Sequence, residues 1–331
     1  MDHIVHYNPQ LPEEIASPCY VVDIQRLKAN LAILEAIQRS TGCKILCALK
    51  GFAMHSVFPI LSQSLAGVCA SGPHEARLGS EEFGKEVHVF APAFSSRDIE
   101  ELLPIAHHIS FNSFNQWRVH RETIAQSGHS ISCGLRVNPG YSEVKVEIYD
   151  PCASGSRLGI PRSEFEGESL DEIEGFHFHA LCEQDSGTLE RVLASFEKQF
   201  GEWLPQLKWV NFGGGHHITS PSYDRERLVR ILNQFQERHP NLEVYLEPGE
   251  AIAINTGVLV ATVLDIIHNE IDIAILDVSA TCHMPDILEM PYRPEIVDAG
   301  LPDEYSNTYR LGGLSCLAGD VIGDYSFKAP L

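Results

Sequence analysis

The residue with the clearest chemical potential is a lysine that follows a short apolar run. The segment Lys44–Gly51 reads KILCALKG, so Ile45–Leu49 predicts a buried strand and Lys50 stands where the chain leaves it. Strand ends are where α/β enzymes keep their reactive groups. Partial burial lowers the pKa of a lysine amine, which can then condense with an aldehyde. The alternative is an ordinary lysine that extends from a strand end into water.

Two histidines end another predicted strand. Phe176–His179 reads FHFH, and the alternation of side chains along a strand predicts that His177 and His179 share one face. A two-histidine metal site is one interpretation, but no third ligand stands at a suitable spacing, so we expect no metal. We favour a flat imidazole that stacks on an aromatic cofactor.

Three consecutive glycines, Gly213, Gly214 and Gly215, follow the seventh predicted strand. They let the backbone approach a ligand closely and can direct several N–H groups at it, which suits a phosphate. In a (β/α)₈ barrel, the loops after strands seven and eight are the favoured phosphate site. A plain tight turn is the alternative.

A carboxylate and a thiol complete the candidate groups. Glu247 closes the eighth predicted strand in the sequence LEPG. A buried carboxylate needs a partner, and either a protonated pyridine nitrogen or an arginine such as Arg136 would serve. Cys316 stands between glycines in GGLSCLAGD, which would expose its thiol as a proton donor or nucleophile. The alternative is one more buried cysteine.

The composition limits the partners. The chain of 331 residues has a formal net charge of −21. Such a surface repels nucleic acid and anionic membranes and attracts small cations into an acidic cleft, so we expect neither nucleic acid nor membrane as a partner. The nine cysteines are scattered without a CxxC pair, which predicts reduced thiols and a cytoplasmic protein. No apolar stretch is long enough to span a bilayer, and the first residues lack the features of a signal peptide.

Short apolar runs alternate with amphipathic helical stretches through the first part of the chain. The strand-like runs lie at about 45–49, 66–70, 87–91, 108–111, 133–137, 175–180, 209–213 and 243–247. Helical stretches lie at 24–39, 73–84, 97–103, 115–127, 188–204 and 224–238. Eight such units predict the α/β class and a (β/α)₈ barrel, with an open doubly wound sheet as the alternative.

After Gly249 the pattern becomes rich in β-strand signals. Val258–His268 and Ile271–Ser279 are joined by Asn269-Glu270, which predicts a hairpin, and 311–314 and 321–327 continue in the same manner. The segment 281–304 is rich in proline and acidic residues and indicates an ordered insertion. We therefore expect a barrel over residues 19–250 and a C-terminal all-β domain over 251–331, with contributions from 1–18.

Taken in order, these motifs resemble the alanine-racemase-like, fold-type III pyridoxal-phosphate decarboxylases. The match includes ALKG, CAS with a following Glu75, SRLG at 156–159, FHFH, the glycine run, EPG and the glycine-flanked cysteine. Within that family, LCALKGFA, NFGGGHHIT, LEPGEA, CHMPD and GGLSCLAGD are similar to the carboxynorspermidine (carboxyspermidine) decarboxylase branch. The resemblance covers nearly the whole chain.

The resemblance implies a role for each matching residue. Lys50 would hold pyridoxal 5'-phosphate covalently, His179 would stack on its ring, and Glu247 would keep its pyridine nitrogen protonated. Gly213–Gly215 would bind the phosphate, and Arg136 would lie near the edge of the ring. These residues would supply orientation and charge to the cofactor's own chemistry.

The same resemblance implies a homodimer with its active site at the interface. Cys316 of the partner subunit would donate a proton after decarboxylation, and Asp320 would pair with a basic group of the partner such as Arg157. The expected reaction converts carboxynorspermidine or carboxyspermidine to norspermidine or spermidine, a step of polyamine biosynthesis. The alternatives are decarboxylation of another basic amino acid such as diaminopimelate or ornithine, racemisation, and a non-catalytic pyridoxal-phosphate-binding protein.

Three departures from the family pattern bear on the substrate and on the β domain. Glu250 stands where the ornithine and diaminopimelate enzymes carry a phosphate-binding arginine, and Leu317 where they carry an acidic residue. A longer cationic substrate would then be held elsewhere, and we take Asp286 and either Glu183 or Asp185 as the candidates. Relatives continue beyond Pro330 with further strands and a tyrosine that contacts the cofactor, so we expect a C-terminally truncated β domain with an unpaired edge.

Overall fold

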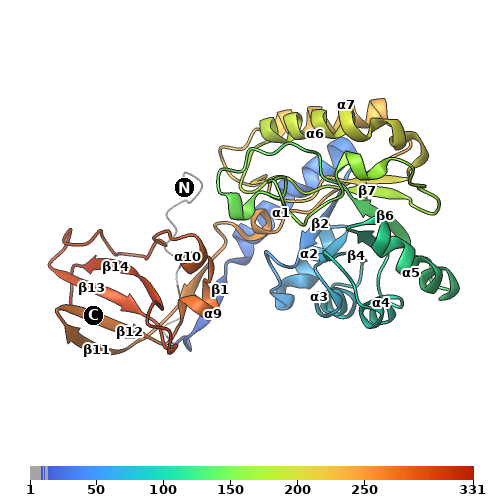
Figure 1. Cartoon of the computed structure of the whole chain (residues 1–331). Helices are drawn as coiled ribbons and strands as arrows, with labels where there is room; N and C mark the ends of the chain where they lie inside the picture. The colour runs from blue at the N-terminus through green and yellow to red at the C-terminus, as the bar shows by residue number, and fades with distance from the viewer. Residues whose placement is uncertain (1–8, 10, 12–13) are drawn as a thin grey trace. The chain divides into compact units, whose positions relative to one another are not determined.

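The computed structural model describes residues 9, 11 and 14–331, which form two compact units (Figure 1). The first unit comprises Gln25–Ile254. The second comprises Asn255–Leu331 together with the described residues up to Ile24. Each unit has its own strands and its own buried core.

The first unit is a closed barrel of eight parallel strands in the order of the sequence. The strands are β2 (Lys44–Ala48), β3 (Gly67–Ala70), β4 (Glu86–Phe90), β5 (His108–Phe111), β6 (Ser132–Arg136), β7 (Gly175–His177), β8 (Trp209–Asn211) and β9 (Glu243–Leu246). β2 pairs with both β3 and β9, which closes the barrel. The predicted (β/α)₈ barrel is confirmed, and the open sheet is excluded.

Helices follow the strands and surround the barrel. They are α1 (Ile24–Thr41), α2 (Phe58–Ser64), α3 (Pro73–Leu78), α4 (Ser96–Leu102), α5 (Phe114–Gln126), α6 (Ser186–Phe200), α7 (Arg225–Arg238) and α8 (Glu250–Ala253). Shorter 3₁₀ or π turns are η1 (His55–Val57), η2 (Gly79–Phe83), η3 (Glu147–Tyr149), η4 (Arg162–Phe165) and η5 (Gly201–Gln206). The sequence pattern missed α2, whose seven residues are too short for a periodic signal.

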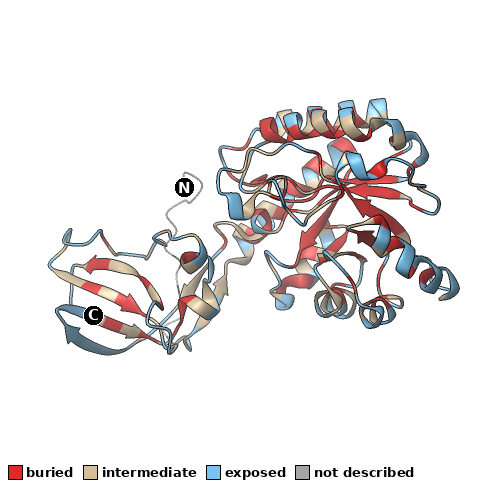
Figure 2. Ribbon diagram, in the orientation of Figure 1, coloured by how far each residue is buried: buried red, intermediate tan, exposed pale blue. Residues whose placement is uncertain are grey.

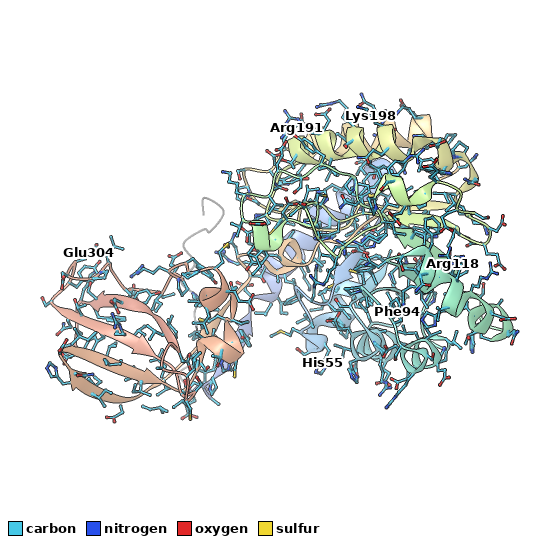
Figure 3. All side chains as sticks on the ribbon, viewed as in Figure 1. His55, Phe94, Arg118, Arg191, Lys198 and Glu304 are labelled. Atoms are coloured by element: carbon cyan, nitrogen blue, oxygen red, sulfur yellow. The ribbon has the colours of Figure 1, made fainter. Side chains whose placement is uncertain are left out.

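The helices bury one face each, as Figure 2 shows by the red stripe along their inner sides. In α6 the buried residues include Leu189, Val192 and Phe196, which recur at helical spacing. Arg191 and Lys198 of the same helix extend outward from the barrel (Figure 3). The polar groups inside the barrel therefore belong to the ends of the strands and not to the helices.

The second unit contains a four-stranded sheet and a two-stranded sheet. The first consists of β11 (Val263–Asn269), β12 (Ile271–Leu276), β13 (Asn307–Gly312) and β14 (Val321–Phe327), and the second of β1 (Cys19–Val22) and β10 (Gly257–Val260). The hairpin between β11 and β12 is confirmed, with Glu270 at φ 62° in its turn. Ala274, Tyr309 and Tyr325 lie in the core of this unit.

Two features of this unit differ from the sequence prediction. The segment expected as an ordered insertion contains the short helices α9 (Ala280–His283) and α10 (Asp286–Glu289), so the unit is not purely β. The strand β1, which we counted with the barrel, pairs antiparallel with β10 in the second unit. A strand at the start of a domain gives no sequence signal for its partner, because the pairing is non-local.

Candidate active site

Lys50 lies in the turn that directly follows β2, at the end of the barrel where all eight parallel strands finish. The turn packs closely on the loop after β9, because a Cβ at Gly51 would lie 3.0 Å from the Cα of Gly249. Lys50 itself is exposed. Its amine is open to a ligand at this end of the barrel.

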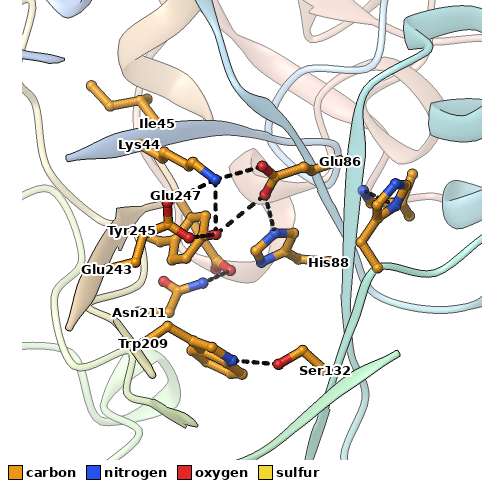
Figure 4. A network of polar contacts seen from close by, with 12 residues as sticks. Lys44, Ile45, Glu86, His88, Ser132, Trp209, Asn211, Glu243, Tyr245 and Glu247 are labelled. Atoms are coloured by element: carbon orange, nitrogen blue, oxygen red, sulfur yellow. Dashed lines mark hydrogen bonds and ion pairs between the residues drawn. The ribbon is translucent and has the colours of Figure 1, made fainter. Parts of the chain in front are cut away.

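Glu247 follows β9 and lies beside two polar residues from neighbouring strands. Asn211 Nδ2 donates a hydrogen bond to its Oε1 at 2.6 Å (Figure 4), and Nε2 of His177 lies 3.6 Å from its Oε2. Only 11% of the Glu247 side chain is exposed. Burial raises the pKa of Glu247, but His177, Asn211 and the charge of Lys50 outweigh it, and the pKa lies below its usual value. Glu247 is therefore a buried, ionised carboxylate.

Arg136 ends β6 and is buried, but it is not the partner of Glu247. Its guanidinium lies over the ring of Phe90, 4.5 Å from the centroid, and donates a hydrogen bond to the backbone oxygen of His179 at 3.3 Å. Burial lowers the pKa of Arg136 to about 10, which still leaves it charged at neutral pH. The carboxylate thus has no arginine among its recorded ion pairs in residues 14–331.

The two histidines of FHFH lie at the end of β7, which ends at His177, and the backbone N–H of Phe178 still bonds to Asn211 of β8. His177 is buried inside the barrel, 3% exposed. His179 lies in the following loop, where its Nδ1 accepts a hydrogen bond from the N–H of Gly214 at 3.0 Å. Burial lowers the pKa values of both imidazoles, so both are neutral at neutral pH. Phe176 and Phe178 both pack against α6, which agrees with the predicted alternation of the two histidines to the other side.

The glycine loop follows β8 and packs against backbone on both sides. Gly213 and Gly215 have φ of 71° and 81°. A Cβ at Gly214 would lie 2.2 Å from the oxygen of Glu247, and one at Gly215 would lie 2.0 Å from the oxygen of Leu181. These glycines are required by turn geometry and close packing, so the tight-turn interpretation is part of the explanation.

Two of the three glycine N–H groups are engaged within the protein. The N–H of Gly213 donates to Oδ1 of Asn211 at 2.8 Å, and that of Gly214 donates to His179. The loop therefore connects the candidate ring-stacking histidine to the residue that holds Glu247. A phosphate at this loop would be bound by its remaining N–H groups or by exchange with these internal bonds.

The predicted residues of the second unit lie on its loops. Cys316 is exposed in the loop between β13 and β14. Asp320 is buried, and its carboxylate accepts hydrogen bonds from the N–H groups of Ser315 at 3.0 Å and Ala280 at 2.7 Å. Asp320 therefore braces the loop that carries the thiol. Asp286 is exposed at the first position of α10.

The two acidic candidates after β7 have different environments. Glu183 is exposed and has φ of 53°, a left-handed conformation that is uncommon outside glycine. Asp185 is the N-cap of α6, where its Oδ1 accepts the N–H of Thr188 at 2.9 Å. Glu183 is thus the freer of the two carboxylates.

Arg157, the suggested partner of Asp320, accepts a hydrogen bond from Asn112 Nδ2 at its backbone oxygen.

A polar network at the opposite end of the barrel was not predicted. Lys44 Nζ lies 2.7 Å from Glu86 and 2.8 Å from Glu243, and Glu86 also bonds His88 at 3.0 Å (Figure 4). Tyr245 joins the same carboxylates through its hydroxyl. The signal available in the sequence was the alternation in EVHVF, which turns Glu86 and His88 to the same side of β4.

Among the described residues, Glu86, His88 and His108 form a group that could bind a metal ion. One potential ligand atom of each lies within 4.8 Å of the others. The imidazoles of His88 and His108 stack with centroids 3.9 Å apart and an interplanar angle of 14°. Imidazole binds a metal through an in-plane lone pair, so one ion cannot lie in the planes of two stacked rings. The ammonium group of Lys44, which is paired with Glu86, would also repel a metal cation at this place. We interpret the group as a hydrogen-bonded barrel interior.

The residues at the carboxyl ends of the barrel strands fit a pyridoxal phosphate. A buried ionised carboxylate, an exposed lysine and a neutral imidazole bonded to the glycine loop are the groups that its ring nitrogen, aldehyde and ring face require. Nε2 of His177 is buried beside them without a hydrogen-bond partner among the described residues. Sequence reasoning missed Asn211, which holds the carboxylate, and it assigned a different role to His177, which faces the carboxylate.

Comparison with known proteins agrees with this fit. The sequence model of a family described as "Pyridoxal-dependent decarboxylase, C-terminal sheet domain" matches residues 19–331. The carboxyaminopropylagmatine decarboxylase of Synechocystis is 49% identical over 325 residues, which are 98% of this chain and 83% of that protein. The carboxynorspermidine/carboxyspermidine decarboxylase of Campylobacter jejuni is 43% identical over 330 residues, 96% of this chain and 85% of that protein.

A solved structure gives the same result. The crystal structure of carboxynorspermidine decarboxylase from Campylobacter jejuni, complexed with norspermidine, superposes with a TM-score of 0.86 at 42% identity. It covers 96% of this chain and 85% of the other. This chain belongs to the family of pyridoxal-dependent decarboxylases, and the resemblance inferred from its motifs is confirmed. Within residues 9, 11 and 14–331, no helix has the length and apolar character needed to cross a membrane.

Proposed function

We propose that this chain decarboxylates carboxynorspermidine or carboxyspermidine, with pyridoxal 5'-phosphate as cofactor, and so forms norspermidine or spermidine. The observation that carries the proposal is the ionised Glu247, held by Asn211 at the same end of the barrel as Lys50. Two relatives above 40% identity bear names of decarboxylases that act on carboxylated polyamine precursors. The reaction belongs to polyamine biosynthesis.

Each residue near the strand ends has a role in this proposal. The amine of Lys50 holds the cofactor covalently, and the carboxylate of Glu247 faces its ring nitrogen. His179, neutral and fixed by Gly214, lies against the ring, while Arg136 supplies positive charge nearby. Gly213–Gly215 bind the phosphate. When bound, the cofactor accepts the electron pair that the leaving CO₂ releases.

The proton that replaces CO₂ comes from the thiol of Cys316 in this proposal. That thiol is exposed on a loop braced by Asp320, which suits a group that must reach a ligand. We assign it to the active site of the partner subunit in a homodimer. Sγ gives its proton to the carbon that lost the carboxylate, and solvent restores it afterwards.

The cationic part of the substrate requires acidic groups. Glu183 and Asp286 are exposed carboxylates, and we assign them to the amines of the substrate together with Asp185, whose second oxygen remains after it caps α6. Asp320 is assigned to the loop of Cys316 rather than to a direct substrate contact, because its oxygens are engaged within its own unit. All nine cysteines are free thiols, which supports a cytoplasmic location.

A second candidate substrate is carboxyaminopropylagmatine, which ends in a guanidinium instead of an amine. The observation that favours it is the 49% identity to a decarboxylase of that name. The two substrates share the carboxylated aminopropyl end where the reaction occurs and differ at the far end. Discrimination between them therefore depends on the acidic groups away from the cofactor.

A substrate panel tests the proposal directly. Purified protein is incubated with pyridoxal phosphate, and CO₂ release is measured from carboxynorspermidine, carboxyspermidine, carboxyaminopropylagmatine, diaminopimelate and ornithine. Borohydride reduction followed by peptide mapping is expected to find the cofactor on Lys50, and the variant Lys50→Ala is expected to retain none. Cofactor on Lys50 without CO₂ from any of these compounds would support a non-catalytic binding protein and overturn the assigned reaction.

A further inference from the structure

The last residue of β7, His177, has a buried nitrogen that no hydrogen bond satisfies. Its side chain is 3% exposed, and its Nε2 has no hydrogen-bond partner among the described residues. A buried donor without an acceptor costs about 1–3 kcal/mol. The carboxylate oxygen Oε2 of Glu247 lies 3.6 Å from this nitrogen, slightly beyond hydrogen-bond distance. His177 is thus positioned to act on Glu247.

Glu247 is held by hydrogen bonds from Asn211 and from the thiol of Cys69. Its Oε1 accepts the hydrogen bond from Asn211, whose own Oδ1 is fixed by the N–H of Gly213. Oε2 is the oxygen that faces His177. A neutral N–H from His177 at Oε2 would fix the plane of the carboxylate and leave its negative charge intact.

The imidazole of His177 is itself held in place. The ring of Phe90 packs against it edge-on, with centroids 5.4 Å apart and an interplanar angle of 79°. The guanidinium of Arg136 lies over the same phenylalanine. Burial lowers the pKa of His177 to about 4, and Arg136, Lys50 and His88 oppose its protonation while Glu247 favours it. His177 therefore remains neutral at neutral pH and does not replace a cationic ligand as the counter-ion of Glu247.

We propose that His177 is a positioning residue that acts through Glu247, donating its Nε2–H to Oε2 so that the ionised carboxylate is directed at the ring nitrogen of the bound cofactor. The inference rests on the proposed function, because it takes Glu247 as the partner of that nitrogen. It adds a donor to those supplied by Asn211 and Cys69. A protonated histidine in the same place would compete with the pyridinium, and the environment of His177 prevents this.

The experiment compares two ligands that differ only at the ring nitrogen. Dissociation constants are measured for pyridoxal phosphate and for its 1-deaza analogue, in which C–H replaces that nitrogen, with the wild-type chain and with His177→Leu and His177→Gln. We expect His177→Leu to weaken the binding of pyridoxal phosphate about tenfold, which is the effect of losing one hydrogen bond to a charged group. The binding of the analogue should be unchanged. His177→Gln, which keeps an N–H donor, is expected to recover part of the loss.

Two controls separate positioning from packing. His108→Leu removes another barrel histidine with a buried unpartnered nitrogen, Nδ1, at the opposite end of the strands, and is expected to change neither constant. Glu247→Gln is expected to remove the preference for pyridoxal phosphate, and His177→Leu added to it is expected to have no further effect on that preference. His177→Met repeats the test with a different apolar shape if the leucine variant does not fold.

The outcomes distinguish this inference from the function on which it rests. Equal weakening of both ligands by His177→Leu or His177→Met would mean that the histidine only fills space, and would overturn the inference. If the wild-type chain binds both ligands equally and Glu247→Gln has no effect, the assignment of Glu247 to the ring nitrogen is wrong and the proposed function fails at that point. Thermal unfolding of each apo variant verifies that the binding data refer to folded protein.

Discussion

Asn211 joins Glu247 to the glycine loop, because its amide donates to Oε1 of Glu247 at 2.6 Å and accepts the N–H of Gly213 at 2.8 Å. One side chain at the end of β8 thus fixes the carboxylate after β9 and the loop that we assign to the phosphate. These two parts of the site are therefore coupled, and a change at Asn211 should affect both.

The variant Asn211→Leu tests this coupling. It leaves Oε1 of Glu247 and the N–H of Gly213 buried without their partner, so the free energy of unfolding should fall by about 2 kcal/mol. The affinity for pyridoxal phosphate should fall about tenfold or more, since both the carboxylate and the loop lose their support. Urea denaturation of the apo protein and titration with the cofactor measure the two effects.

Asn138→Leu is the matched control, because Asn138 accepts the N–H of Gly140 at 2.8 Å in the same kind of turn but is not bonded to Glu247. It should lower stability by a similar amount and leave cofactor affinity within about twofold of the wild type. Equal losses of affinity in the two variants would show that Asn211 is an ordinary turn residue.

A second prediction concerns the pH dependence of stability through Glu86. Burial raises the pKa of this carboxyl, but its hydrogen bonds to His88 and Lys44 outweigh burial and hold the pKa at about 2, below the ordinary value of 4.5. Because the folded-state pKa is lowered, the stabilisation is present above the unfolded-state value and is lost as the pH falls toward the folded-state value. Glu86→Gln should therefore lower the free energy of unfolding on the order of 2 kcal/mol at neutral pH.

The difference between wild type and Glu86→Gln should shrink as the pH is lowered from about 5 toward 2, which denaturation at a series of pH values measures. Glu35→Gln removes a carboxylate from an exposed i,i+4 pair with Arg39 and should change stability by less than about 1 kcal/mol at any pH. A loss at Glu86 that is independent of pH would contradict the assigned electrostatic cause.

A third prediction separates close packing from backbone strain in the glycine loop. Gly215 and Gly128 have φ of 81° and 73°, but a Cβ at Gly215 would lie 2.0 Å from the oxygen of Leu181, whereas nothing lies within 4 Å of one at Gly128. Gly128→Ala should cost about 1 kcal/mol of stability from the left-handed conformation alone. Gly215→Ala should cost substantially more and should also weaken cofactor binding, because the loop must move. Similar costs in the two variants would contradict the packing argument.

The barrel was predictable because its strands are apolar along their length and recur with helices between them. Ile45, Leu46 and Cys47 of β2 are fully buried, and such runs are visible in the sequence without any knowledge of their neighbours. Closure of the sheet was not visible, since it depends on the pairing of β2 with β9 across the whole first unit. The motifs identified Lys50, Glu247 and the glycine loop because each stands directly after such a strand.

The partners of these residues could not be predicted in the same way. His177 and Asn211 meet Glu247 only because β7, β8 and β9 are neighbours in the closed barrel, so no local spacing indicates the contact. The strand alternation could group His177 with His179, but it could not show that His177 faces Glu247 and that His179 bonds to the glycine loop. Burial of Glu86 and His88 follows from their inward direction on β4, which a short strand indicates only weakly.

The last prediction concerns the loop of Cys316. Asp320 holds this loop through the N–H of Ser315 and anchors it to the N–H of Ala280 at the start of α9. Asp320→Ala should loosen the loop, so the decarboxylation rate kcat should fall about tenfold or more while cofactor affinity is unchanged. The rate at which iodoacetamide alkylates Cys316, followed by peptide mapping, should change with it.

Asp277→Ala is the control within the same unit, because Asp277 accepts the N–H of Thr262 at 2.8 Å and the hydroxyl of Ser17 at 2.6 Å, and neither of these partners belongs to the Cys316 loop. It should lower stability as Asp320→Ala does, by about 1–3 kcal/mol, without a comparable effect on kcat or on alkylation of Cys316. If both variants reduced kcat equally, the effect would come from general loosening of the unit. A loss confined to Asp320→Ala would mean that this buried carboxylate contributes to catalysis through the position of the thiol.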